Sequence, residues 1–228
     1  MRQAFHLMLA LVPLWLASAP AVRAQNAADP TVYVVRYIEV APGSETQGAA
    51  LVKKLADASR KEAGAMRFEV AQRTAPANQF ITFEVWKDQA DLDAHNGAAH
   101  KQFLDAVQSV LIAPVDDRPC VAIDVAPVQT TAAGAIYAIT HVDVAPPNTG
   151  AGIALLKTVA GPSRKEGGNL AFDALQQTAR KNHFEVVEIW GDQKAEDTHE
   201  GNSATKDYRA KVQPLLGAHY DRRWYRQL

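Results

Sequence analysis

Apolar and polar side chains follow different periods along residues 31–126, in a fixed order. A run rich in Val, Tyr and Ile ends at a Pro-Gly turn, a segment with apolar residues at helical spacing follows, and two alternating runs are joined by a Pro-containing turn. Alternation predicts strands, and recurrence every three to four residues predicts helices. We therefore predict the order strand, helix, strand, strand, helix, strand, at residues 31–40, 44–64, 66–74, 80–86, 88–111 and 120–125.

The same pattern occurs twice. Residues 59–64 recur at 163–168, and between residues 59 and 97 the two copies agree without a gap at 18 of 39 positions at an offset of 104. A fixed offset of this kind indicates a duplication. Ser44 and Gln47 are spaced as a capping box for the first helix, and Asn148 holds the cap position in the second copy. Pro162 stands where the first copy has Ala58, which predicts that the second copy's helix kinks or ends early.

A β-α-β-β-α-β order predicts a ferredoxin-like α+β domain. One face of its open sheet needs a cover, and a duplicated chain provides it by packing its two sheets together. We therefore predict an internal pseudo-dimer, with further oligomerisation left open. The predicted segments are a signal peptide (1–24), a first domain (31–126), a linker (127–134) and a second domain (135–228).

The first 24 residues have the layout of a secretory signal peptide. Arg2 precedes an apolar stretch at residues 7–16, and small residues precede a cut after Ala24. The apolar stretch is shorter than the roughly 20 residues that span a bilayer. We expect an exported protein, periplasmic or secreted, with no membrane contact after cleavage. A retained anchor is the alternative.

Composition excludes several classes. The 228 residues carry 24 Lys and Arg against 25 Asp and Glu, so the basic excess of a nucleic-acid binder is absent. The single cysteine, Cys120, forms neither an intramolecular disulfide nor a multi-thiolate metal site. The sequence has no Gly-rich turn between a strand and a helix, so we expect no flavin or nicotinamide.

The histidines are the first candidates for chemistry. His95 and His199 correspond in the two copies, and imidazole is suited to a base because its pKa lies near neutrality. The alternative is a core histidine bonded to a backbone carbonyl. His100 lies five residues after His95, about 140° around a continuous helix, so we expect the two side chains not to share a face and no metal site to form.

Aromatic and charged side chains complete the candidate site. On the strand at residues 80–86, Trp86 shares a face with Glu84, and the second copy repeats the pair as Trp190 and Glu188. The tryptophans either wall an aromatic pocket or fill the core. The glutamates either orient a histidine or pair with the helix-end arginines, and we favour the ion pairs. The arginines are Arg60 and Arg164, and the remaining candidate side chains are Phe103, Tyr33, Tyr137 and Tyr208.

These motifs resemble the antibiotic biosynthesis monooxygenase family. The resemblance rests on residues 59–64, the run at 80–86, Ala94-His95, His100 and Phe103. It implies a dimeric α/β barrel, here built within one chain. It also implies a cofactor-independent monooxygenase that acts on a small phenol or quinol in a pocket between sheet and helices. The family's haem-degrading branch has an asparagine on the first strand, where this sequence has Arg36 and Thr140.

The first copy contains more of the candidate site residues than the second. At an offset of 104 the second copy has Ala204, Asp207 and Glu196 in place of His100, Phe103 and Leu92, and Trp224 falls at the position of Cys120. The resemblance implies a small aromatic molecule as the partner. We predict His95, His199, Arg60 and Arg164 as catalytic, and a pocket lined by Trp86, Trp190, Glu84, Glu188, His100, Phe103, Tyr33, Tyr137 and Tyr208. The alternative function is a periplasmic module that binds the same molecule without turning it over, or a catalytically inactive protein of this fold. A third possibility is an isomerase that uses the histidine to move a proton and needs no oxygen.

Overall fold

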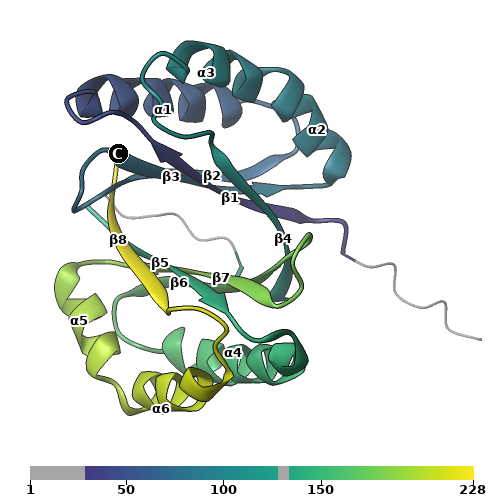
Figure 1. Ribbon diagram of the computed structural model, residues 1–228, viewed down its shortest axis with the longest axis vertical. Helices are drawn as coiled ribbons and strands as arrows, with labels where there is room; N and C mark the ends of the chain where they lie inside the picture. Colours follow the sequence, from purple (N-terminus) through teal and green to yellow (C-terminus); the bar gives the residue numbers. More distant parts are fainter. Residues whose placement is uncertain (1–28, 128–133) are drawn as a thin grey trace, which may run out of the picture.

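The computed structural model of the chain describes residues 29–127 and 134–228. The predicted signal peptide and residues 128–133 of the predicted linker lie outside the described residues. The elements fall into two units of the same order (Figure 1). The first contains β1 (Val32–Glu39), α1 (Glu45–Ser59), β2 (Ala65–Arg73), β3 (Gln79–Trp86), α2 (Gln89–Gly97), α3 (Ala99–Val107) and β4 (Asp116–Asp124). The second contains β5 (Ile136–Asp143), η1 (Pro146–Asn148), α4 (Thr149–Ser163), β6 (Asn169–Gln177), β7 (His183–Trp190), α5 (Gln193–Gly201), α6 (Ser203–Val212), η2 (Gln213–Leu215) and β8 (Asp221–Gln227).

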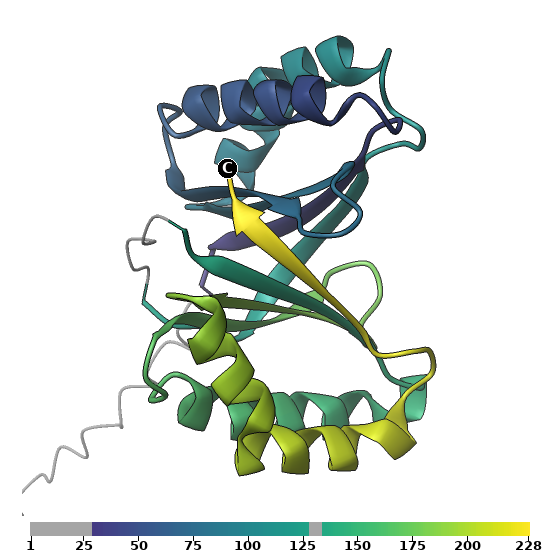
Figure 2. The same ribbon diagram turned by 90° about the vertical axis from the view of Figure 1, so that its left-hand side faces the viewer.

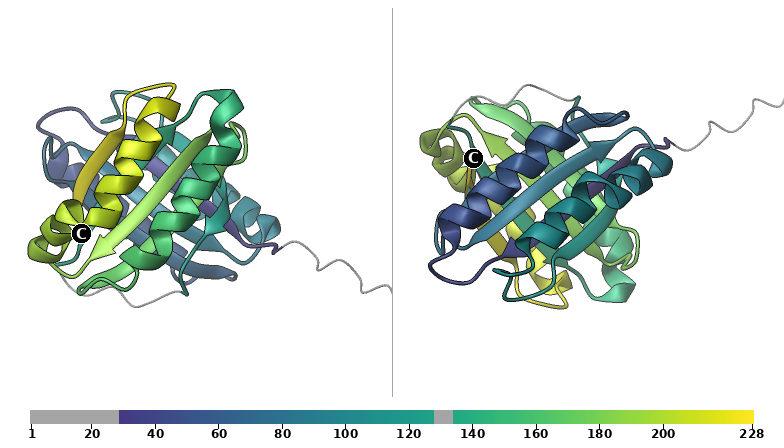
Figure 3. Two further views of the ribbon diagram at one scale, coloured as in Figure 1. Left: turned by 90° about the horizontal axis from the view of Figure 1, so that it is seen from below. Right: turned by 90° about the horizontal axis from the view of Figure 1, so that it is seen from above.

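The strands close into one antiparallel barrel in the order β1-β3-β2-β8-β5-β7-β6-β4. The last strand of each unit joins the two units, because β4 pairs with β6 and β8 pairs with β2. The helices form two layers on opposite sides of the barrel (Figure 2), with α1 beside α3 on one side and α4 beside α6 on the other (Figure 3). The predicted pair of ferredoxin-like units, packed sheet to sheet within one chain, is confirmed.

Alternation along the strands divides the core into three parts. On β1, Tyr33 and Val35 point into the barrel, whereas Val34 and Ile38 point toward the helices. One cluster fills the barrel and one lies under each helical layer. Each sheet therefore buries both faces, and a polar side chain on the helix side is as enclosed as one inside the barrel.

The predicted helix at 88–111 is two helices. At Ala98, φ is −117° and ψ is −98°, which ends α2 and lets α3 start in a new direction. Gly97, the last residue of α2, directly precedes this point, but a single glycine is tolerated inside a helical pattern, and the sequence analysis predicted one continuous helix. In the second unit Asn202 stands at the junction, and its side chain accepts a hydrogen bond from the backbone of Ala204.

The helix ends also differ from expectation. Ser44 and Asn148 sit at the N-cap positions but make no capping hydrogen bond with their side chains. Asn148 donates to the backbone carbonyl of Leu215 instead. Pro162 does not shorten its helix, since α4 spans 15 residues as α1 does. So close to the helix end, proline removes only one backbone hydrogen bond of the last turn.

The second unit contains one extra residue at the junction of α5 and α6. Tyr33 pairs with Cys120 on β4, and its equivalent Tyr137 pairs with Tyr225 on β8. Buried side chains of α3 at His100, Phe103 and Val107 likewise match Thr205, Tyr208 and Val212 of α6. The offset is thus 105 beyond this junction. The predicted equivalences of His100 with Ala204, Phe103 with Asp207 and Cys120 with Trp224 were wrong by one residue.

Among the described residues, no helix is both long and apolar enough to span a bilayer.

Candidate functional site

A buried arginine is the centre of the polar cluster under the first helical layer. Arg36 lies on the helix side of β1 and is 2% exposed. Its Nε donates to Glu84 Oε1 at 2.8 Å, and its Nη2 donates to Asn96 Oδ1 at 2.6 Å. Its Nη1 is 2.8 Å from both Asp117 Oδ1 and His100 Nε2. This guanidinium therefore ties β1 to β3, β4, α2 and α3.

Glu84 is fully buried and is held by three donors. Besides Arg36, Thr82 Oγ1 donates to its Oε1 at 2.7 Å and Trp86 Nε1 donates to its Oε2 at 3.0 Å. A buried carboxylate is tolerated when its oxygens are paired in this way. The partner of Glu84 is thus Arg36 rather than the predicted Arg60, and Trp86 and Glu84 share a face as predicted.

His95 is enclosed beside this pair. Its Nδ1 lies 2.6 Å from Glu62 Oε2, and its ring centroid is 4.6 Å from that of Trp86. Its Nε2 makes no hydrogen bond and lies 3.7 Å from Glu84 Oε2. His95 is 1% exposed, and it is separated from Asp117 by Glu84 and Arg36 on one route and by His100 on another.

His100 joins the cluster because of the break at Ala98. Its ring centroid is 5.7 Å from that of His95, so the predicted separation of the two rings was wrong. Because a guanidinium only donates, His100 Nε2 accepts from Arg36, which assigns the ring proton to Nδ1. Burial, and then the positive charge of Arg36, lower the pKa of His100 to about 4.

The lowered pKa of His100 predicts how the stability of the fold depends on pH. Between about pH 6.5, the ordinary pKa of histidine, and pH 4, the unfolded chain binds a proton at this residue and the folded protein does not. The free energy of unfolding is therefore expected to fall as the pH falls through this window. In His100→Gln, urea unfolding at pH 7 and pH 5 is expected to show a smaller loss of stability than in the wild type. Equal losses in the two proteins would contradict this assignment.

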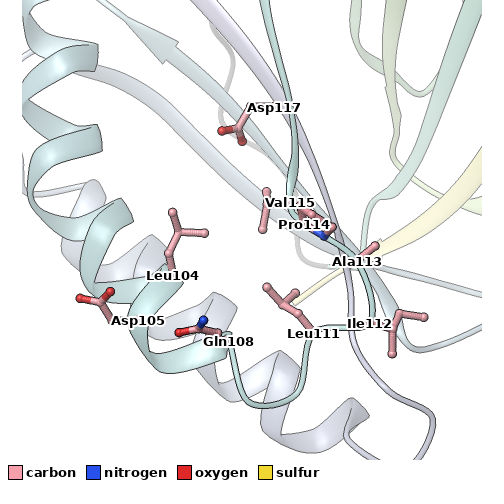
Figure 4. A pocket seen from close by; sticks show the side chains of 9 residues that line it. All are labelled: Leu104, Asp105, Gln108, Leu111, Ile112, Ala113, Pro114, Val115 and Asp117. Atoms are coloured by element: carbon pink, nitrogen blue, oxygen red, sulfur yellow. The ribbon is translucent and has the colours of Figure 1, made fainter.

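A surface groove has Asp117 at one of its ends (Figure 4). It lies between α3 and the segment that leads into β4, and its volume is about 610 Å³ (Figure 4). Asp117 is half-exposed at one end of it, with burial raising the pKa of its carboxyl and Arg36 opposing that shift. The other lining residues are mostly apolar and comprise Leu104, Asp105, Gln108, Leu111, Ile112, Ala113, Pro114 and Val115.

The second unit fills the corresponding space. At the positions of Arg36 and Asp117 it has Thr140 and Arg222, so the guanidinium comes from the last strand instead of the first. Arg222 bonds Glu188 through two nitrogens and Glu196 at 3.1 Å. The pocket lined by Arg222, Glu188, His199 and Tyr208 has a volume of only about 10 Å³. His199 keeps its aromatic neighbour, with ring centroids 4.6 Å from Trp190.

Four predicted site residues lie elsewhere. Arg60 Nε donates to the carbonyl of Phe68 at 3.0 Å, and Arg164 bonds Asp124 and the carbonyl of Phe172. These arginines hold neighbouring strands and do not contact Glu84 or Glu188. Tyr33 and Tyr137 point into the barrel, on the opposite face of the sheet from the histidines. The remaining candidates, Phe103 and Tyr208 included, lie on the helix side.

The sequence interpretation missed three contributors, Arg36, Asp117 and Glu62. Arg36 lies two residues from Val34 and two from Ile38, so strand alternation places it on their side of β1. This was a usable signal for a helix-facing side chain. Asp117 could not be found, because its pairing with Arg36 depends on the register of β1 and β4. Among the described residues, no group of three or more His, Cys, Asp or Glu side chains is arranged to hold a metal ion.

Comparisons with known proteins agree with this architecture. The family model described as "Antibiotic biosynthesis monooxygenase" matches residues 31–108 and 135–211, one segment in each unit. A "putative monooxygenase YcnE" of Bacillus subtilis (strain 168) is 32% identical over 81 residues, which cover 35% of this chain and 85% of that protein. The crystal structure of a "putative monooxygenase" from Fusobacterium nucleatum has a TM-score of 0.79 at 16% identity and covers 89% of this chain and 94% of its own. An "anthrone oxidase-like protein" has a TM-score of 0.68 at 12% identity, covering 88% and 92%. At these identities the two structures show the fold alone.

Proposed function

We propose, because this chain belongs to the antibiotic biosynthesis monooxygenase family, that its first unit oxidises a small phenol or quinol with molecular oxygen and without an added cofactor. The observation that carries the proposal is the Arg36–Asp117 pair at the end of the apolar groove. An apolar wall suits an aromatic ring, and the paired charges suit its hydroxyl group.

Asp117 is the proposed base. A carboxylate at the end of the groove is placed to accept the hydroxyl proton, and burial raises its pKa and so makes it a stronger base. The Arg36 guanidinium, 2.8 Å from Asp117, stabilises the phenolate that remains. The apolar body of the substrate covers the half-exposed carboxylate and excludes water from the reacting atoms.

The reaction balances without a reductant. The phenolate gives one electron to O2, and the ring radical and superoxide combine at a ring carbon that carries hydrogen. The proton on that carbon then passes to the outer peroxide oxygen, the C–H electron pair forms the carbonyl with the inner oxygen, and the O–O bond breaks. The other oxygen leaves as hydroxide, takes the proton from Asp117 and becomes water. The substrate supplies all four electrons and becomes a quinone.

His95 and His199 have other roles in this proposal. The contact of His95 with Glu62 and Trp86 fixes the ring under the helices, and Glu84, Arg36 and His100 lie between His95 and Asp117 of the groove. In the second unit, the pocket beside Arg222 and Tyr208 has a volume of only about 10 Å³, which is too small for a substrate. The second unit is therefore proposed as a structural partner that completes the barrel.

Oxygen uptake by the purified protein tests the proposal. The protein is isolated from the periplasm of the expressing host, where the pattern of residues 1–24 leads us to propose export and an N-terminus at Gln25. Catechols, quinols and naphthols are supplied with ¹⁸O2 and no cofactor, and one labelled oxygen is expected in the quinone and one in water. Saturable binding of a naphthol without oxygen uptake would replace this proposal with the binding module.

A further inference from the structure

A second pocket lies at one open end of the barrel. Its volume is about 170 Å³, which is less than the 300 Å³ or more typical of drug-sized sites and suits a single ring. The segment at 113–114 separates it from the groove, because both pockets include these residues. Its lining comes from both units and comprises Tyr37, Ile38, Glu39, Gln79, Phe80, Ala113, Pro114, Asp116, Arg118, Arg223 and Tyr225.

Tyr225 lines this pocket and has a buried, unsatisfied hydroxyl. Its side chain is fully buried, and its Oη makes no hydrogen bond within the described part of the chain. Burial raises the pKa of this phenol to about 12, so the hydroxyl keeps its proton at neutral pH. A buried hydroxyl without a partner is costly, and an acceptor placed in the pocket would relieve that cost.

Two arginines lie beside it, and only one has a nitrogen to spare. All three nitrogen positions of Arg118 are occupied, since Nε and Nη2 bond Asp116 and Nη1 bonds Glu185. Arg223 bonds Asp221 through Nε and Nη2, which leaves its Nη1 without a carboxylate. Both guanidinium groups approach the ring of Tyr37, at 4.3 Å and 5.6 Å from its centroid.

The charges of the lining cancel. The lining contains two guanidinium groups, Arg118 and Arg223, and two carboxylates, Glu39 and Asp116, and Arg118 bonds Asp116 directly. An anion would meet two carboxylates and a cation would meet two guanidinium groups, so the lining favours an uncharged ligand. The Tyr225 hydroxyl and Arg223 Nη1 both offer hydrogen-bond donors to such a ligand.

We propose that this pocket binds a small, uncharged, planar carbonyl compound, whose oxygen accepts hydrogen bonds from Tyr225 and Arg223 and whose ring lies beside the guanidinium groups. The site is independent of the proposed oxygenation, and it needs both units because Tyr225 and Arg223 come from β8 while Tyr37 comes from β1. The structural equivalent of Tyr225 is Cys120, whose Sγ bonds the carbonyl of Arg118, so the duplicated chain forms this donor pair once.

Benzamide is the probe that tests the site. A ligand of this size is expected to bind with a dissociation constant of about 1 mM, measured by ligand-observed NMR on the full chain. Tyr225→Phe is expected to weaken binding about tenfold, because it removes one donor. Benzoate, which has the same shape and a negative charge, is expected to bind more weakly than benzamide.

The matched control is Tyr208→Phe. Tyr208 is also a buried tyrosine whose Oη has no hydrogen-bond partner in the described residues, but it lies under the second helical layer. Benzamide is expected to bind this variant like the wild type. Leu104→Glu, which places a charge in the groove, is also expected to leave benzamide binding unchanged. The proposal is overturned by an absence of binding at about ten times the expected constant, by unchanged binding in Tyr225→Phe, or by loss of binding in Leu104→Glu.

Discussion

Asp117→Asn is expected to lower kcat/KM for phenol oxygenation by about 10²- to 10⁴-fold, the range that loss of a general base produces. Asparagine has nearly the same volume, and its carbonyl oxygen still accepts a hydrogen bond from Arg36, so the fold and the groove are retained. The loss should therefore appear mainly in kcat. Steady-state oxygen uptake with one naphthol at several concentrations separates the two constants.

Two further variants test whether the loss of activity is due to Asp117 as the base. Asp105→Asn removes another carboxylate from the groove lining, one that does not contact Arg36, and is expected to change kcat less than about twofold. His95→Gln tests the base that the sequence predicted. If oxygenation collapses in His95→Gln and survives in Asp117→Asn, the proton goes to His95 and the proposed role of Asp117 is wrong.

Arg36→Met is expected to lower the free energy of unfolding by about 3–5 kcal/mol, the cost of leaving one partner of a buried ion pair alone. Methionine fills part of the space but gives Glu84 no donor, and it also leaves His100 and Asn96 without their bonds to the guanidinium. Urea unfolding at pH 7 measures the change.

Arg60→Met is the matched control. Arg60 is 45% exposed, and an arginine at the surface contributes about 1 kcal/mol or less through its ion pair. The double variant Arg36→Met with Glu84→Gln is expected to recover part of the loss, because it removes the unpaired charge. A double variant as unstable as the sum of the two single variants would show that the Arg36–Glu84 pair contributes nothing beyond packing.

The sequence predicted the fold because two independent patterns agreed. The change of period from strand to helix gave the order of elements, and the duplication gave that order twice. The face of each strand also followed from alternation, which correctly placed Glu84 with Trp86. These properties depend on neighbours along the chain, and the sequence contains them directly.

The site could be predicted only in part, because it depends on contacts between distant segments. Gly97 precedes the break at Ala98 that brings His100 beside His95, but one glycine is tolerated within a helical pattern and did not by itself predict the change of direction. The extra residue before α6 lies beyond the part of the repeat with strong identity, and a gapless alignment placed the last strand one residue out of register. That single step reversed the side of every residue of β8 and concealed the equivalence of Asp117 and Arg222.

The buried arginine comes from a different strand in each half, and this bears on how a duplicated chain evolves. In a dimer of identical subunits every substitution appears twice, so a replacement that suits one copy must also be tolerated in the other. Here the guanidinium comes from Arg36 in one half and from Arg222 in the other. Joining the two halves in a single polypeptide released each from the other's constraints. One half was free to close around its own side chains while the other kept an open groove for a ligand.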